Sequence, residues 1–184
     1  VIRNLATPTA SNAGSDQSVC GVSTSLNGNN PAVGTGQWSF AVGGNPDNNG
    51  AISDATSRTT VVTGTAGQVY RLVWTISNGT CTASTDEVQI TFGGAIPVAN
   101  AGADQLNLCG VTSTTLAANA AAPGTGTWSV VSGTGGSFAN PNSPATTFNG
   151  NGGVTYVLRW TISNGICMDS QDQVTIRFDQ TPTV

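Results

Sequence analysis

The sequence contains no lysine and no histidine, and Glu87 is its single glutamate. Without histidine, neither a Ser-His-Asp triad nor a Cys-His pair can form, and general acid–base catalysis would depend on carboxylates alone. Only 8% of the 184 residues are charged, compared with about 25% in an average soluble protein. The five scattered arginines and the net charge of −4 provide no cluster of positive charge for nucleic-acid phosphates. We therefore expect no enzymatic activity, no cofactor and no nucleic-acid partner.

Long apolar runs and metal-binding cysteine motifs are also absent. No apolar stretch approaches the ~20 residues that a helix needs to cross a bilayer. The four cysteines include no Cys-x-x-Cys pair, which is the spacing typical of structural zinc sites. We therefore expect neither a membrane span nor a zinc site in this segment.

The sequence does contain one unit that occurs twice. Residues 70–79 (YRLVWTISNG) return as residues 156–165 (YVLRWTISNG). The other matches, in the same order, are Asn12-Ala13-Gly14 with Asn100-Ala101-Gly102, Cys20-Gly21-Val22 with Cys109-Gly110-Val111, and Trp38 with Trp128. Because convergence is a poor explanation for so many matches in register, we infer two tandem copies of one domain.

The repeat also sets the expected domain boundaries. The first copy covers residues 7–95 and the second copy covers residues 96–180. Residues 1–6 match the end of a copy, so we expect them to be the tail of a preceding repeat. Residues 181–184 match the opening of a copy, so we expect a following repeat to start there. The chain is then expected to be part of a longer array, with neighbouring repeats as its partners.

Alternation of apolar and polar residues predicts β-strands. Residues 70–76 and residues 88–92 each alternate with a period of two, which is typical of half-buried strands. Asn78-Gly79 lies between them and predicts a tight hairpin. Shorter strands are expected around Val19, Leu26, Trp38 and Val62. Short strands at this spacing, without any helical period, predict an all-β fold of two tandem immunoglobulin-like β-sandwich domains.

The aromatic residues are expected to fill the cores of the two copies. Phe138 aligns with Ile52, and Phe148 aligns with Val62. A ligand-binding aromatic has no reason to alternate with an aliphatic residue between copies, whereas a core position tolerates that exchange. The expected core residues are Trp38, Tyr70, Trp74, Trp128, Tyr156 and Trp160.

Each copy contains two cysteines, and four cysteines allow three pairings. The pairs Cys20–Cys81 and Cys109–Cys167 are favoured because each pair keeps one repeat self-contained. A bridge that closes a loop of about 60 residues would stabilise the domain by roughly 4 kcal/mol in the chain-entropy model. Disulfides indicate an oxidising, extracellular setting.

Two groups of polar residues are the candidates for calcium. Asn45, Asp47 and Asn49 follow the first ligand positions of an EF-hand loop, but the glutamate of the last position and the flanking helices are missing. Asp16 and Asp104 recur in both copies, where a calcium between domains is the alternative interpretation. A structural role in turns or across strands is favoured for both groups, so no metal ligand is expected.

Several of these motifs resemble a known family. The Asn-Ala-Gly-x-Asp-Gln opening, Trp38 and the Tyr-x-Leu-x-Trp-Thr-Ile-Ser-Asn-Gly strand resemble PKD-like, immunoglobulin-like domains. With Cys-Gly near the start and Gly-x-Cys after the hairpin, both copies resemble the tandem repeats of giant cell-surface adhesins of Bacteroidetes-type bacteria. Those adhesins include gliding-motility adhesins exported by the type IX route. The PKD motif Trp-x-Phe-Gly-Asp-Gly reads WSFAVG at residues 38–43, so the repeat is a PKD-like relative.

This resemblance implies an extracellular protein of the cell surface, with surface polysaccharide or other cells as adhesion targets. We expect a non-catalytic repeat segment that acts as a stalk or spacer of an adhesin or filament. Two alternatives remain. A polysaccharide-binding module of a secreted protein would need an exposed row of aromatic side chains. A self-assembling filament subunit would insert residues 1–6 into the sheet of a neighbouring molecule by strand exchange.

Overall fold

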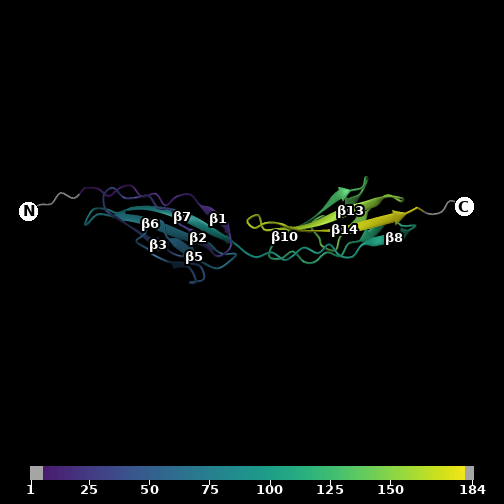
Figure 1. Cartoon of the computed structure of the whole chain (residues 1–184), viewed down its shortest axis with the longest axis horizontal. Coiled ribbons are helices and arrows are strands. Elements are labelled where there is room, and N and C mark those ends of the chain that lie inside the picture. The colour runs from purple at the N-terminus through teal and green to yellow at the C-terminus, as the bar shows by residue number, and fades with distance from the viewer. Residues whose placement is uncertain (1–5, 181–184) are drawn as a thin grey trace, which may run out of the picture. The chain divides into compact units, whose positions relative to one another are not determined.

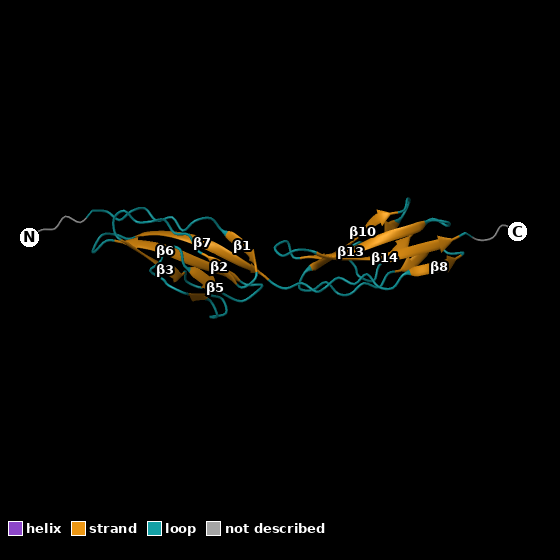
Figure 2. Cartoon of the chain, viewed as in Figure 1, coloured by secondary structure: helices purple, strands orange, loops and turns teal. Residues whose placement is uncertain are grey.

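The computed structural model describes residues 6–180, and every regular element in that range is a β-strand (Figures 1 and 2). The chain divides into two compact units, Val1–Ala95 and Ile96–Val184. The expected tail of a preceding repeat and the expected start of a following one lie outside the described residues, apart from Ala6. No helix that could span a membrane occurs between residues 6 and 180.

The first unit is a sandwich of a four-stranded and a three-stranded sheet (Figure 1). The larger sheet has the strand order β1-β7-β6-β3, and the smaller sheet has the order β2-β5-β4. The strands are β1 (Gln17–Cys20), β2 (Ser23–Ser25), β3 (Thr35–Phe40), β4 (Ala51–Ile52), β5 (Val61–Thr63), β6 (Val69–Ser77) and β7 (Ser84–Gly93). β1 runs parallel to β7, whereas the other neighbouring strands pair antiparallel.

The second unit repeats this arrangement. Its larger sheet has the order β10-β13-β14-β8, and its smaller sheet has the order β11-β12-β9. The strands are β8 (Gln105–Cys109), β9 (Ser113–Thr115), β10 (Thr125–Ser132), β11 (Ser137–Phe138), β12 (Thr147–Asn149), β13 (Thr155–Ser163) and β14 (Ser170–Asp179). β8 again runs parallel to the last strand, β14. The predicted fold class, two tandem immunoglobulin-like β-sandwiches, is therefore confirmed.

The chain passes from the larger to the smaller sheet immediately after each first strand. Gly21 lies at this step with a φ of +131°, and Gly110 lies at the equivalent step with a φ of +71°. Glycine adopts such positive φ values without the steric cost that other residues have. The recurring Cys-Gly pair therefore ends the first strand and redirects the chain into the opposite sheet.

Each unit has its own core between its two sheets, as the alternation in residues 70–76 and 88–92 predicted. The first core contains Ala13, Leu26, Trp38, Val62, Tyr70, Leu72, Trp74, Ile76, Val88, Ile90 and Phe92. The second core contains Ala99, Ala101, Leu116, Trp128, Phe148, Tyr156, Leu158, Trp160, Ile162, Val174, Ile176 and Phe178. Both cores bury the inward-facing side chains of the two longest strands, so the same sequence period forms both.

The two cores exchange aromatic and aliphatic residues at equivalent positions. Ile52 pairs with Val62 between β4 and β5, and Phe138 pairs with Phe148 at the same register between β11 and β12. Phe40 packs partly buried against the first core and supplies a ring that these aliphatic residues lack. The two cores therefore place their bulky side chains at different positions. Cores tolerate such exchanges when the total side-chain volume is kept.

The connection between β6 and β7 is longer than the sequence predicted. Ser77 ends β6 and Ser84 begins β7, so residues 78–83 form the loop. Gly79 has a φ of +59°, but Asn48 is the only described residue other than glycine with a positive φ. A two-residue Asn-Gly turn, which needs positive φ at both positions, is therefore not formed. The longer loop carries Cys81 at the end of the sheet.

Candidate functional site: cysteines at opposite ends of each repeat

The aromatic side chains form no binding platform on the described surface. Every tryptophan is at most 2% exposed, namely Trp38, Trp74, Trp128 and Trp160. Tyr70 and Tyr156 are fully buried. The Tyr70 hydroxyl donates to Asp47 Oδ1 at 2.8 Å, and the Tyr156 hydroxyl donates to the Thr134 carbonyl oxygen at 2.8 Å. Residues 6–180 therefore lack the exposed aromatic row that a polysaccharide-binding module of the expected kind needs.

Asp16 and Asp104 have the same structural contact in the two copies. Asp16 Oδ1 accepts a hydrogen bond from the Gln89 amide at 2.9 Å. Asp104 Oδ1 accepts one from the Thr175 amide at 2.8 Å. Each carboxylate thus joins the segment before the first strand to the last strand of its own repeat.

A second recurring pair of carboxylates fixes the opening segment of each repeat. Asp86 Oδ2 accepts a hydrogen bond from the Ala13 amide, and Asp172 Oδ2 accepts one from the Ala101 amide, both at 2.7 Å. Ala13 and Ala101 are buried. The hydrogen bonds therefore give a partner to two backbone amides that would otherwise be buried without one.

The polar groups of the loop around Asp47 form hydrogen bonds with other residues of the first repeat. Asn45 Oδ1 accepts from the Gly50 amide at 2.9 Å, and Asn45 Nδ2 donates to the Gly50 carbonyl oxygen at 3.2 Å. Asp47 Oδ1, which accepts from Tyr70, also accepts from the Asn49 amide at 3.1 Å. Across residues 6–180, no three His, Cys, Asp or Glu side chains gather in a metal-binding arrangement.

These hydrogen bonds stabilise the ionised form of Asp47. The hydrogen bond with the Thr65 side chain has the largest effect, desolvation opposes it, and the hydrogen bonds with Tyr70 and Asn49 lower the pKa further. Together they lower the pKa of Asp47 to about 2. Asp47 is therefore a charged acceptor that holds the loop to the buried Tyr70 hydroxyl.

The two cysteines of the first repeat lie at opposite ends of its larger sheet. Cys20 ends β1 and is opposite Gly93, the last residue of the parallel strand β7. Cys81 lies in the loop before Ser84, the first residue of β7. The ten residues of β7 span roughly 30 Å at about 3.4 Å per residue. A disulfide requires Cα atoms less than about 7 Å apart, so Cys20 and Cys81 cannot be joined.

The second repeat has the same arrangement. Cys109 ends β8 and is opposite Asp179, the last residue of β14. Cys167 lies in the loop before Ser170, where β14 begins. The roughly 30 Å length of the strand again separates the two sulfurs. In each repeat, one cysteine therefore marks the end at which the last strand leaves the domain, and the other marks the hairpin end.

Both predicted disulfides, Cys20–Cys81 and Cys109–Cys167, are consequently wrong. Cys20 and Cys167 are each disulfide-bonded. Cys109 is an exposed free cysteine. The Cys81 thiol donates a hydrogen bond to the Ala6 carbonyl oxygen with a sulfur–oxygen distance of 3.6 Å.

The parallel pairing of the first and last strands is the feature that the sequence pattern does not reveal. Both copies place the second cysteine after the hairpin, which is visible in the sequence as Gly-x-Cys. A parallel first strand ends beside the other end of the last strand, but parallel and antiparallel pairing cannot be distinguished by alternation alone, because both have a period of two. A disulfide within each repeat is therefore compatible with the sequence pattern, and the strand register excludes it.

Solved structures with immunoglobulin-like tandem domains resemble the chain. Murine CEACAM1b has a TM-score of 0.59 and 11% sequence identity, and the match covers 90% of this chain and 95% of that one. Sidekick-1 immunoglobulin domains 1–5 have a TM-score of 0.58 and 12% identity over 97% of this chain. The match spans 40% of the Sidekick-1 chain. These similarities establish the immunoglobulin-like fold.

A PKD domain from the KIAA 1837 protein has 26% identity and a TM-score of 0.40, over 50% of this chain and 97% of that one. No protein-family model matches the chain. No curated protein matches its sequence.

Proposed function

We propose that this chain is a non-catalytic repeat segment of an extracellular, cell-surface adhesin or filament, in which the repeats act as folded spacers. The observation that carries the proposal is that one sequence unit forms two separately closed sandwiches. Tandem immunoglobulin-like domains are typical of cell-surface proteins. A disulfide is typical of an oxidising, extracellular compartment.

The chemistry of the described surface also supports a spacer. The tryptophan and tyrosine side chains lie in the cores, and the recurring carboxylates accept hydrogen bonds from backbone amides. The large bacterial surface adhesins that the repeat resembles are the context in which we place the proposal, with surface polysaccharide or other cells as targets of the complete protein.

Single-molecule stretching between the two termini tests the spacer function. In reducing solution, the two repeats should unfold in two separate force peaks, because each has its own core. Each peak should release roughly 300 Å, since about 90 residues extend by about 3.3–3.6 Å each. Smooth extension without peaks, or one step that releases both repeats together, would contradict the proposal.

A further inference from the structure

We propose that the first repeat binds an extended, acidic peptide segment in a groove at the edge of β3, where Gly36 offers its backbone and Arg58 offers its charge. The groove has a volume of about 460 Å³, which is within the range of ligand pockets. The residues that line it include Gly36, Thr56, Arg58 and Trp74. This binding function goes beyond the spacer function, because a folded spacer needs no ligand.

The groove lies over an uncovered part of a sheet edge. β3 pairs antiparallel with β6, and Trp38 is opposite Trp74 in this pair. The Trp38 amide donates to the Ala55 carbonyl oxygen at 2.7 Å, so it points away from β6. Because this direction alternates along an antiparallel strand, the amide and carbonyl groups of Gly36 also point away from β6. Within residues 6–180, no other segment forms a backbone hydrogen bond with Gly36 on this side.

The glycine keeps this part of the backbone within reach of a ligand. A Cβ atom on Gly36 would overlap Cζ2 of Trp74, so the packed indole requires a residue without a side chain. For the same reason the backbone is only half-buried at Gly36. Unpaired amide and carbonyl groups at a sheet edge form hydrogen bonds with an added strand, which is how sheets bind extended peptides. A peptide backbone is therefore the group that fits this edge.

Arg58 determines the charge of the ligand. It is exposed, and it is the single charged residue among those that line the groove. Neither ion pair found within residues 6–180 involves Arg58. Asp54 is the nearest carboxylate along the chain, but it does not line the groove, and its Oδ1 accepts hydrogen bonds from the Thr56 amide and hydroxyl. A carboxylate of the peptide is therefore the group that complements Arg58.

The second repeat has an equivalent groove without a charged residue. Its lining residues include Gly126, Pro144 and Trp160. Pro144 takes the place of Arg58, since both carbonyl oxygens accept a hydrogen bond from an amide that follows the second strand of the repeat. Gly126 is buried, whereas Gly36 is half-buried. The second groove therefore lacks both the charge and the accessible edge, so we expect the peptide to select the first repeat.

The test uses the complete isotope-labelled chain and two blocked pentapeptides, acetyl-Thr-Val-Asp-Val-Thr-amide and the same peptide with asparagine in place of aspartate. Both contain β-branched residues that favour an extended chain. In an NMR titration, the acidic peptide should shift the Gly36 amide signal and slow the hydrogen exchange of that amide. The neutral peptide should bind about two- to fivefold more weakly, which is the change expected when an exposed ion pair is lost. The Gly126 amide signal should not shift with either peptide.

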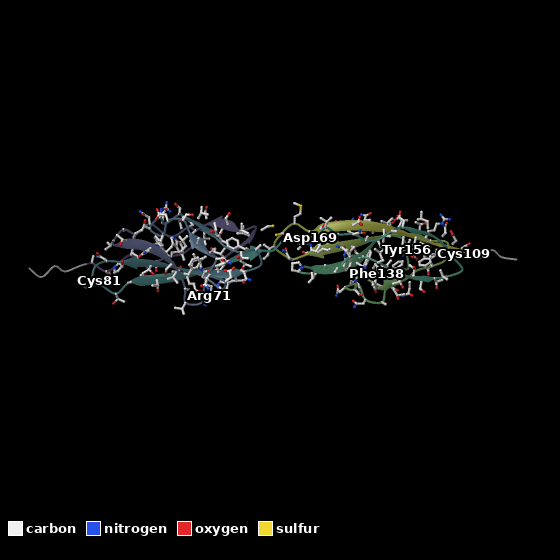
Figure 3. The ribbon with its side chains drawn as sticks, turned by 90° about the horizontal axis from the view of Figure 1, so that it is seen from below. Arg71, Cys81, Cys109, Phe138, Tyr156 and Asp169 are labelled. Carbon is white, nitrogen blue, oxygen red and sulfur yellow. The ribbon has the colours of Figure 1, made fainter. Side chains whose placement is uncertain are left out.

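Two variants of the first repeat test the role of the arginine. Arg58→Gln should reduce the affinity for the acidic peptide to that for the neutral one. Arg71→Gln is the matched control, because Arg71 lies outside the groove, where its exposed side chain pairs with Glu87 at 3.4 Å. Figure 3 shows Arg71 at the surface of the first unit. Its replacement should leave the affinity unchanged, and the amide spectra verify that both variants are folded.

Any of four outcomes would overturn the proposal. Equal affinities for the two peptides would show that Arg58 does not select a carboxylate. Shifts around Arg58 without slower exchange at Gly36 would show an ionic contact without strand pairing. Equal shifts at Gly126 would show binding without selection between the repeats. The absence of any shift at millimolar peptide would show that the groove takes no such segment. The stretching experiment contains no peptide, so its result bears on the spacer function alone.

Discussion

Replacement of Gly126 by alanine should destabilise the second repeat, because this glycine lies against the indole of Trp160. Gly126 in β10 pairs with Ile162 in β13. A Cβ atom on Gly126 would overlap Cζ2 and Cη2 of Trp160 and would approach Ala121 Cβ to 3.0 Å. The indole has no room to move, since Trp160 is fully buried and its ring centre is 5.2 Å from that of Trp128.

Two effects of opposite sign determine the magnitude. Alanine restricts the unfolded chain more than glycine does, which stabilises a protein by about 0.4–1 kcal/mol where the methyl group fits. An overpacked core costs about 1–3 kcal/mol, and the two packed indoles place this site at the upper limit. We expect the free energy of unfolding of the second repeat to fall by about 2 kcal/mol, which lowers its Tm by roughly 8–16 °C.

Differential scanning calorimetry measures this change, and Gly152→Ala is the matched control. Gly152 belongs to the same repeat, lacks a positive φ, and its Cβ would have the Asp179 carbonyl oxygen as its nearest neighbour at 4.0 Å. Its replacement should leave the Tm unchanged or slightly higher. Trp160→Phe removes the part of the ring that contacts Gly126, so Gly126→Ala should cost less in that background. Equal effects of the two glycine substitutions would refute the reasoning.

Two further predictions concern carboxylates. Because hydrogen bonds from Thr65, Tyr70 and Asn49 lower the pKa of Asp47 to about 2, its stabilisation is complete above the unfolded-state pKa near 3.8 and is lost as the pH falls toward 2. In the Asp47→Asn variant, the free energy of unfolding measured by urea titration should depend less on pH in this range. An unchanged pH dependence would contradict the lowered pKa of Asp47. Asp172→Ala removes the acceptor of the Ala101 amide and should cost the second repeat about 1–2 kcal/mol. Asp169→Ala, in the exposed hairpin loop, should cost under ~0.5 kcal/mol in the same urea titration.

The strands and the cores could be predicted from sequence because they depend on local periodicity. Alternation in residues 70–76 assigns each side chain to one face of a strand, and the duplicate copy tests each assignment independently. The exchange of Ile52 for Phe138 identified a core position without any coordinates, because a core accepts a change of shape that a ligand contact does not.

The ends of the sheets could not be predicted in the same way. The loop of residues 78–83 differs from a two-residue turn in its backbone angles, and Asn78-Gly79 is compatible with both. The close approach of Gly126 to Trp160 depends on which residues are opposite each other across β10 and β13. Both features follow from strand register, and a register shift of one residue leaves the period of the sequence pattern unchanged.

The positions of the two cysteines within each repeat also change the explanation of how the repeat is stabilised. A domain of about 90 residues buries a modest share of its surface and often depends on an internal bridge. Here the ends of the sheet separate the two cysteines of each copy, so no bridge of this kind can form, and each repeat depends on its packed core. The buried tryptophans and tyrosines of each repeat therefore carry its stability.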